Sequence, residues 1–82
     1  MEDLVSRASL ADIKIIHAIE RYLKSKDIKP FFKNSGKRVY PLGKEGRVYL
    51  NITEGRYSLD NITREEFEQI DRIVLKHRGK SL

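Results

Sequence analysis

The sequence predicts a small α+β domain in which two helices pack on one face of an antiparallel sheet. Two segments near the ends of the chain have the apolar spacing of amphipathic helices, and short alternating runs lie between them. Short connections that contain glycine separate those runs, as hairpins require. We therefore expect a single domain over residues 1–82 in the order α-β-β-β-α, with three strands, or four if residues 28–33 also pair.

The first helix is predicted over residues 10–27, after a flexible lead-in at residues 1–8 that has no clear period. Ser9 is expected to be its N-cap, and an aspartate three residues later approximates a capping box. The helix should end near Asp27, because Pro30 disfavours a helical conformation in the residue before it. Its apolar stripe contains Ala11, Ile15, Ile16, Ala18, Ile19, Tyr22 and Leu23. The opposite side is a basic ridge, defined as Lys14, His17, Arg21 and Lys24.

The predicted sheet follows the turn signal Asn34-Ser35-Gly36, and its strands span residues 37–42, 46–52 and 55–59. Side chains alternate between the two faces of a sheet, so burying Val48 and Leu50 directs Arg47 and Tyr49 outward. The same rule is applied to the neighbouring strands. The residues expected to face inward are Val39, Tyr57 and Leu59. The residues expected to face outward are Arg38, Tyr40, Arg56 and Ser58.

The second helix is predicted to begin after Thr63, because Thr63 and Glu66 have the spacing of a capping box. Its inward residues are expected to be Phe67, Ile70, Ile73 and Val74, with His77 as a further candidate. Gly79 is expected to end this helix, which leaves residues 79–82 as a tail.

The positive charge of the chain is concentrated in the middle. The formal net charge is +5, and residues 1–27 and 60–82 each contain five acids and five bases. Residues 28–59 contain seven bases and two acids, so the whole excess lies there. A localised basic patch is the usual signature of a polyanionic partner.

These observations predict a basic, tyrosine-containing surface on the outer face of the sheet that binds nucleic acid, with DNA favoured over RNA. Arginine can bind phosphate or a base edge with two parallel hydrogen bonds, and tyrosine can stack on unpaired bases. The candidate nucleic-acid-binding residues are Lys37, Arg38, Tyr40, Lys44, Arg47, Tyr49 and Arg56.

Other interpretations fit the same residues. Arginine and tyrosine also suit the solvated face of any antiparallel sheet, and the basic ridge also fits a solvated helix face. A protein-interaction module, such as an inhibitor or adaptor that binds an acidic partner, is the main alternative. A homodimer formed through Ile13 or Leu75, which fall outside the apolar stripes, is a further one.

Several function classes are not expected. The chain has no cysteine. His17 and Glu20 have the spacing to supply two metal ligands, but no third ligand is identifiable, so we expect no metal and no cofactor. No nucleophile or phosphate-binding motif points to an enzyme, and no catalytic residue is predicted. The acidic first residues do not have the pattern of a signal peptide, and no apolar run is long enough to span a membrane. A cytoplasmic protein is therefore expected.

Overall fold

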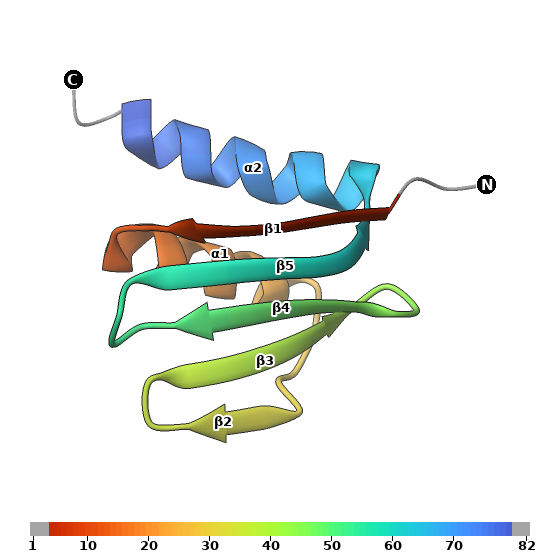
Figure 1. Cartoon of the computed structure of the whole chain (residues 1–82), viewed down its shortest axis with the longest axis horizontal. Coiled ribbons are helices and arrows are strands. Elements are labelled where there is room, and N and C mark those ends of the chain that lie inside the picture. Colours follow the sequence, from red (N-terminus) through yellow and green to blue (C-terminus); the bar gives the residue numbers. More distant parts are fainter. Residues whose placement is uncertain (1–3, 80–82) are drawn as a thin grey trace.

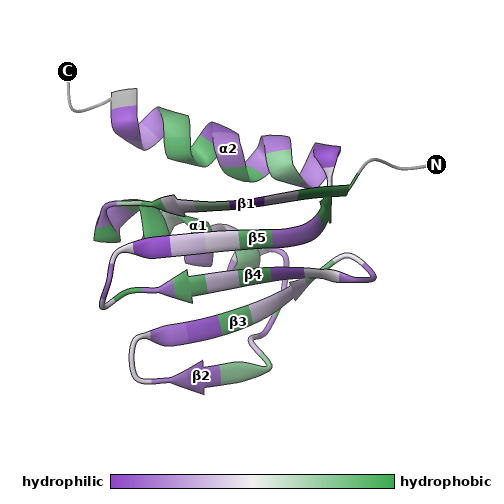
Figure 2. Ribbon diagram, in the orientation of Figure 1, coloured by the Kyte–Doolittle hydropathy of each residue, from purple (hydrophilic) through white to green (hydrophobic). Residues whose placement is uncertain are grey.

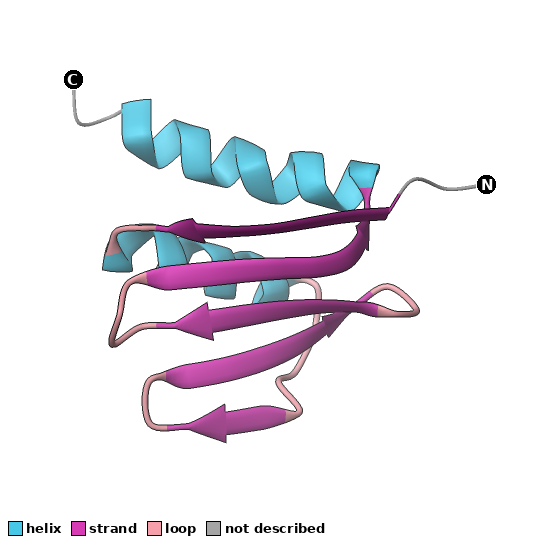
Figure 3. Ribbon diagram, viewed as in Figure 1, coloured by secondary structure: helices cyan, strands magenta, loops and turns pink. Residues whose placement is uncertain are grey.

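The computed structural model of the chain describes residues 4–79, which form two helices and one five-stranded antiparallel sheet (Figures 1 and 3). The elements are β1 (Leu4–Leu10), α1 (Ile13–Ser25), β2 (Phe32–Asn34), β3 (Lys37–Leu42), β4 (Gly46–Asn51), β5 (Arg56–Thr63) and α2 (Arg64–Gly79). The α+β class is thus confirmed. The predicted element order and strand number are inexact, because a further strand, β1, precedes α1. The optional fourth strand predicted at residues 28–33 does pair, but as β2 at Phe32–Asn34. Residues 80–82 of the predicted tail lie outside the described residues.

The strands are arranged in the order β1-β5-β4-β3-β2, and all neighbouring pairs are antiparallel. One face of the sheet, called the inner face, packs against the helices, and α1 lies behind the sheet in Figure 1. Apolar residues of both helices and of β3, β4 and β5 form one core there: Ile15, Ile16, Ile19, Leu23, Tyr40, Leu42, Val48, Leu50, Tyr57, Leu59, Ile62, Ile70 and Val74. The other face, called the outer face, is not covered by any element of residues 4–79.

Strand β1 includes residues 4–8, for which a flexible lead-in is predicted, whereas residues 1–3 of that lead-in lie outside the described residues. The strand pairs with β5 at the edge of the sheet, with Arg7 opposite Leu59 and Ser9 opposite Tyr57. Because these partners face inward, Arg7 and Ser9 face inward too, and the inner positions of β1 are mostly polar. The strand therefore lacks the apolar alternation that would reveal it in the sequence.

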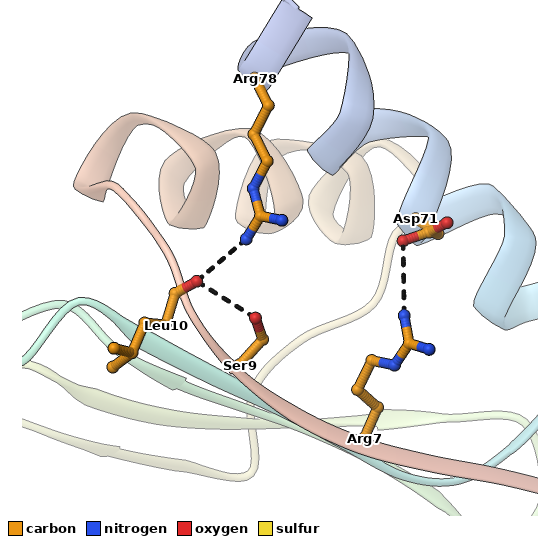
Figure 4. Close-up of polar contacts among 5 residues, drawn as sticks. All are labelled: Arg7, Ser9, Leu10, Asp71 and Arg78. Atoms are coloured by element: carbon orange, nitrogen blue, oxygen red, sulfur yellow. Dashed lines mark hydrogen bonds and ion pairs between the residues drawn. The ribbon is translucent and has the colours of Figure 1, made fainter.

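Helix α2 covers the polar inner side of β1 through charged side chains (Figure 4). The Arg7 guanidinium lies 3.9 Å from the Asp71 carboxylate and 4.8 Å from the centre of the Phe67 ring. At the other end of the strand, the Leu10 carbonyl oxygen accepts hydrogen bonds from the Arg78 side chain at 3.1 Å and from the Ser9 hydroxyl at 3.2 Å. The basic last turn of α2 thus binds the end of β1.

The start of α1 differs from the prediction, because Asp12 and not Ser9 is the N-cap. Its carboxylate accepts a hydrogen bond from the Lys14 backbone N–H at 2.8 Å, which satisfies one of the free donors of the first turn. The predicted N-cap Ser9 belongs to β1. A chain that leaves an edge strand at Leu10 has only Ala11 and Asp12 in which to turn into the helix, so the cap falls later.

The helix α1 ends at Ser25, close to the predicted end. Asp27 has a positive φ of 62°, the Asp27 N–H donates to the Lys24 carbonyl, and the Ile28 N–H donates to the Leu23 carbonyl. This pattern is a Schellman motif, and Ile28 packs against the core, a hydrophobic contact that often accompanies such motifs. A residue other than glycine at the left-handed position carries a conformational cost.

The capping box of α2 is confirmed. The Glu66 N–H donates to the Thr63 hydroxyl at 3.1 Å, and the Thr63 N–H donates to the Glu66 carboxylate at 2.9 Å. Ile70 and Val74 are buried, and Phe67, Ile73 and His77 are half-buried, so the predicted inward side of this helix is also confirmed. Figure 2 shows hydrophobic and hydrophilic residues alternating around α2 and along the central strands.

The predicted inward and outward sets hold for β4 and β5 but are reversed in β3. Tyr40 and Leu42 are buried on the inner face together with the half-buried Arg38, whereas Val39 is on the outer face. The loop before β4 decides this, because Leu42 pairs directly with Gly46 and only three residues connect them. Tyr40 therefore lies opposite the inward-facing Val48, and Val39 lies opposite the outward-facing Tyr49. A pairing shifted by one residue would exchange the two faces of β3, and the prediction did not include this pairing.

Candidate nucleic-acid interface

The outer face contains an aromatic row, defined as Ser58, Tyr49, Val39 and Phe32. Tyr49 pairs with Ser58 of β5 on one side and with Val39 of β3 on the other, and Val39 pairs with Phe32 of β2. Directly paired residues of an antiparallel sheet project from the same face, so these four side chains form a line across four strands. The rings of Tyr49 and Phe32 are 42% and 45% exposed, and no helix of residues 4–79 covers them.

A cationic row runs parallel to the aromatic row, two residues along each strand. It consists of Arg56, Asn51, Lys37 and Asn34, which are likewise paired across β5, β4, β3 and β2. Two residues of a strand span about 7 Å, so this is the separation of the two rows. The cations Arg56 and Lys37 stand on either side of Asn51, about 10 Å apart, because neighbouring strands are about 4.8 Å apart.

The two rows surround a shallow hollow of about 340 Å³. Its outer-face lining includes Phe32, Val39 and Tyr49 from the aromatic row and Lys37 and Arg56 from the cationic row. The floor is formed where β3, β4 and β5 run side by side, so rigid sheet rather than loop positions the side chains. A small volume of apolar and aromatic surface with a few charged groups at its rim is a typical arrangement for binding a planar ligand.

The cations at the hollow have no partner within the described part of the chain. Neither Lys37 nor Arg56 forms an ion pair or a side-chain hydrogen bond with any residue of 4–79. The nearest acid on the outer face by register is Asp60, two residues beyond Ser58 on β5, and it accepts a hydrogen bond from the Ser6 hydroxyl at 2.9 Å. The positive charge at the hollow is therefore available to an anionic ligand.

Arg47 lies on the outer face, as predicted, but outside these two rows. It pairs with Asp60 and Pro41, on the side of the aromatic row away from the cationic row. Its guanidinium lies 5.0 Å from the centre of the Phe31 ring and donates to the Gly46 carbonyl oxygen at 3.0 Å. Its side chain is thus already held in place, although its charge remains on this face.

Lys44 is exposed in the loop between β3 and β4, which is at the opposite end of the strands from the cationic row (Figure 1). It does not line the hollow. Instead it lines a second depression of about 550 Å³ together with Glu45 and Glu66. Two acids in that lining make it unsuitable for a phosphate, so Lys44 is separate from the candidate interface.

Arg38 and Tyr40 were predicted to be outward, and that prediction is wrong. Both face the core, where they bind Glu20 of α1. The Tyr40 hydroxyl donates to Glu20 Oε2 at 2.6 Å, and Arg38 Nε lies 3.1 Å from the same oxygen. The Glu20 side chain is only 10% exposed, so its charge is compensated by these two partners. These three residues are called the Glu20 cluster below.

The Glu20 cluster changes the chemistry of Tyr40. Burial, the hydrogen bond to Glu20 and the charge of that carboxylate together raise the pKa of Tyr40 far above its usual value, while Arg38 opposes the change. A tyrosine that stays protonated and holds a carboxylate has a structural role. Sequence analysis missed Glu20, although a signal exists, since Glu20 follows Ile16 by four residues and so lies on the buried stripe of the helix.

The basic ridge of α1 does not join the candidate interface. Lys14, His17, Arg21 and Lys24 are all exposed, and the opposite side of α1 packs on the inner face of the sheet. The ridge and the hollow are thus separated by the helix and the sheet. His17 Nδ1 lies 3.8 Å from Glu20 Oε1. Within the described residues, no three His, Asp or Glu side chains are grouped so that they could hold a metal ion.

Comparison of the chain with protein-family models, curated proteins and solved structures finds no match. Neither α1 nor α2 is both long and apolar enough to cross a membrane. The case for any function therefore depends on the outer face itself.

Proposed function

We propose that this protein is a small non-enzymatic nucleic-acid-binding protein that uses the outer face of its sheet. The observation that carries the proposal is the exposed Tyr49 ring at the centre of a sheet face without helices, next to the uncompensated cations Lys37 and Arg56. The site differs from the one predicted from the sequence. Lys37, Tyr49 and Arg56 are its centre, Arg47 adds charge at its margin, and Phe32 is a new member.

The chemistry of these groups suits a nucleic acid. Lysine and arginine bind phosphate oxygens through charge-assisted hydrogen bonds, and the amide of Asn51 between them can contact sugar or phosphate. Aromatic rings offer contacts to the bases or the sugars. Placing two cations about 10 Å apart without a partner raises the free energy of the folded protein slightly, and a polyanion removes that cost.

The proposal is tested by fluorescence-anisotropy titration with labelled single-stranded DNA, duplex DNA, single-stranded RNA and duplex RNA at 50 and 200 mM salt. Two phosphate contacts, from Lys37 and Arg56, predict that affinity falls about 7- to 12-fold between these salt concentrations, since each contact adds about 0.7 to 0.9 to the logarithmic slope. Arg56→Gln removes one contact and should reduce the logarithmic salt slope by about 0.7 to 0.9.

Arg21→Gln is the matched control for Arg56→Gln. It removes the same charge from an exposed arginine, but on the basic ridge of α1, which is on the other side of the molecule. We expect wild-type affinity and slope for Arg21→Gln and a weaker, less salt-dependent complex for Arg56→Gln. Equal effects of both variants would show that binding follows net charge alone, and the outer face would then not be the site.

An alternative function is supported by one observation at the end of the sheet. Phe31 and Phe32 are 58% and 45% exposed beside the edge strand β2, and exposed aromatic residues beside an open strand edge suit strand addition by a protein partner. No binding of any nucleic acid at 50 mM salt would reject the first proposal and favour this one. An acidic peptide that adds to the edge of β2 would then be the ligand to test.

A further inference from the structure

We infer that the hollow on the outer face is a stacking site for unpaired bases, so that the protein prefers single-stranded nucleic acid to duplex. This inference rests on the proposed function and specifies its ligand. It follows from the shape of the face, the spacing of the two rows and the absence of an acid in the lining of the hollow.

The width of the sheet argues against duplex binding. Four steps of about 4.8 Å separate β1 from β2, so the face is about 19 Å wide. The major groove of DNA is about 12 Å wide and admits a helix or a two-stranded ribbon, and the minor groove is about 6 Å wide. In duplex RNA the major groove is deep and narrow. Tyr49 lies on β4, the middle strand of this broad face, so its ring cannot reach stacked bases in a regular duplex.

A single strand can use the same face without distortion. Unpaired bases can turn toward a sheet and stack on its aromatic side chains, while the sugar-phosphate backbone lies to one side. Here the aromatic row supplies the rings Tyr49 and Phe32, and the cationic row lies about 7 Å away along the strands with Lys37 and Arg56. That offset suits a backbone running across the strands, with phosphates on the cations and bases directed to the rings.

The lining of the hollow fits a base better than it fits phosphate alone. Tyr49, Val39 and Phe32 provide apolar surface at its aromatic side, and the outer-face cations Lys37 and Arg56 lie at the other side. No acidic residue lines the hollow. A site that recognised only phosphate would have no use for two exposed rings in line, so the combination points to a ligand with both an anionic backbone and flat apolar groups.

The inference predicts separate effects for the two rows. Tyr49→Ala should weaken binding to oligodeoxythymidylate or oligouridylate about 5- to 150-fold, the range found when a stacking ring is removed, and should leave the salt slope unchanged. Tyr49→Phe keeps the ring and should bind within about twofold of wild type. Arg56→Gln should instead lower the slope by about 0.7, the value for one phosphate contact of a single strand.

Duplexes of the same sequences and long-chain inorganic polyphosphate complete the experiment. We expect both to bind more weakly than the single strands and to be insensitive to Tyr49→Ala. If duplex or polyphosphate binds as tightly as the single strands, or Tyr49→Ala binds the single strands like wild type, stacking is rejected while nucleic-acid binding survives. If nothing binds, both proposals are rejected. The exposed position of Tyr49 makes unfolding of the variant unexpected, and Phe32→Ala serves as an independent second variant.

Discussion

Replacing Tyr40 with phenylalanine tests the most consequential correction that the structure makes. The substitution removes one hydroxyl and keeps a ring that is completely buried. If Tyr40 lay on the outer face, the loss of its hydroxyl would leave the stability nearly unaltered. In the observed fold it removes the hydrogen bond of 2.6 Å to Glu20 inside the core, so it should affect the stability and leave ligand binding unaltered.

The magnitude follows from the charge of the acceptor. A hydrogen bond to a charged group contributes about 1.5–3 kcal/mol to the free energy of unfolding, about twice a neutral one. Glu20 cannot recover the loss from water, because its side chain is only 10% exposed. A domain of this size is expected to have a free energy of unfolding of about 4–12 kcal/mol, so Tyr40→Phe removes a substantial share. The corresponding fall in melting temperature is about 6–24 °C.

Urea denaturation followed by circular dichroism measures this loss as a lower midpoint with an unchanged slope. Tyr49→Phe is the matched control, because it removes the same hydroxyl from the same sheet but from an exposed ring on the outer face. The control should change the free energy of unfolding by less than about 0.5 kcal/mol. If Tyr40→Phe is as stable as the control, the buried bond to Glu20 does not contribute, and our account of the Glu20 cluster fails.

Three further predictions concern the pH dependence and the helix ends. The pKa of Tyr40 is raised in the folded state, so its contribution to the free energy of unfolding is fully present below the ordinary tyrosine value of 10.0 and should be lost at higher pH by about 1.4 kcal/mol per pH unit. Urea titrations from pH 8 to 11 should therefore show a shrinking difference in stability between wild type and Tyr40→Phe. A difference that stays constant over this range would contradict the prediction. Asp27→Gly should raise the free energy of unfolding by about 0.5–1 kcal/mol, because glycine adopts the positive φ of 62° without strain, and a lower urea midpoint would refute this. Thr63→Ala should lower the free energy of unfolding by about 1 kcal/mol, because the capping hydroxyl is lost, and α2 and the sheet should melt together at a lower temperature. Thr63→Ser keeps the hydroxyl and should retain most of the stability.

Local signals in the sequence predict much of this fold. The capping box formed by Thr63 and Glu66 marks the start of α2. The spacing of apolar residues in each helix indicates which side of that helix is buried. The strands β3, β4 and β5 begin or end at glycine-containing loops, where the sequence places them. These features depend on residues close together in the chain, so a single sequence contains the information.

The predictions that are wrong depend on contacts between residues that are far apart in the sequence. β1 has a polar inner side, because α2 covers it with Phe67 and Asp71, and no periodicity in residues 4–10 could reveal a partner about sixty residues away. The orientation of β3 depends on its register with β4, in which Leu42 pairs with Gly46. A Cβ at position 46 would overlap the Leu42 carbonyl oxygen, so this close pairing requires glycine. The observed register places Arg38 and Tyr40 in the core instead of at the predicted site.

Arg38, Arg47 and Arg56 are nine residues apart in the sequence. This even spacing is no functional repeat, because hairpins reverse the chain between these residues. Arg38 is paired with Leu50 on the inner face, while Arg56 is paired with Asn51, whose other neighbour is Lys37. Lys37 and not Arg38 is thus the second cation of the candidate interface. Neutralising Lys37 should lower the salt dependence of nucleic-acid binding and leave stability nearly unchanged, whereas neutralising Arg38 should destabilise the fold, because Glu20 would lose its buried counter-charge. The two residues are neighbours in the chain, and the pleat of one strand places the first on the candidate interface and the second in the Glu20 cluster.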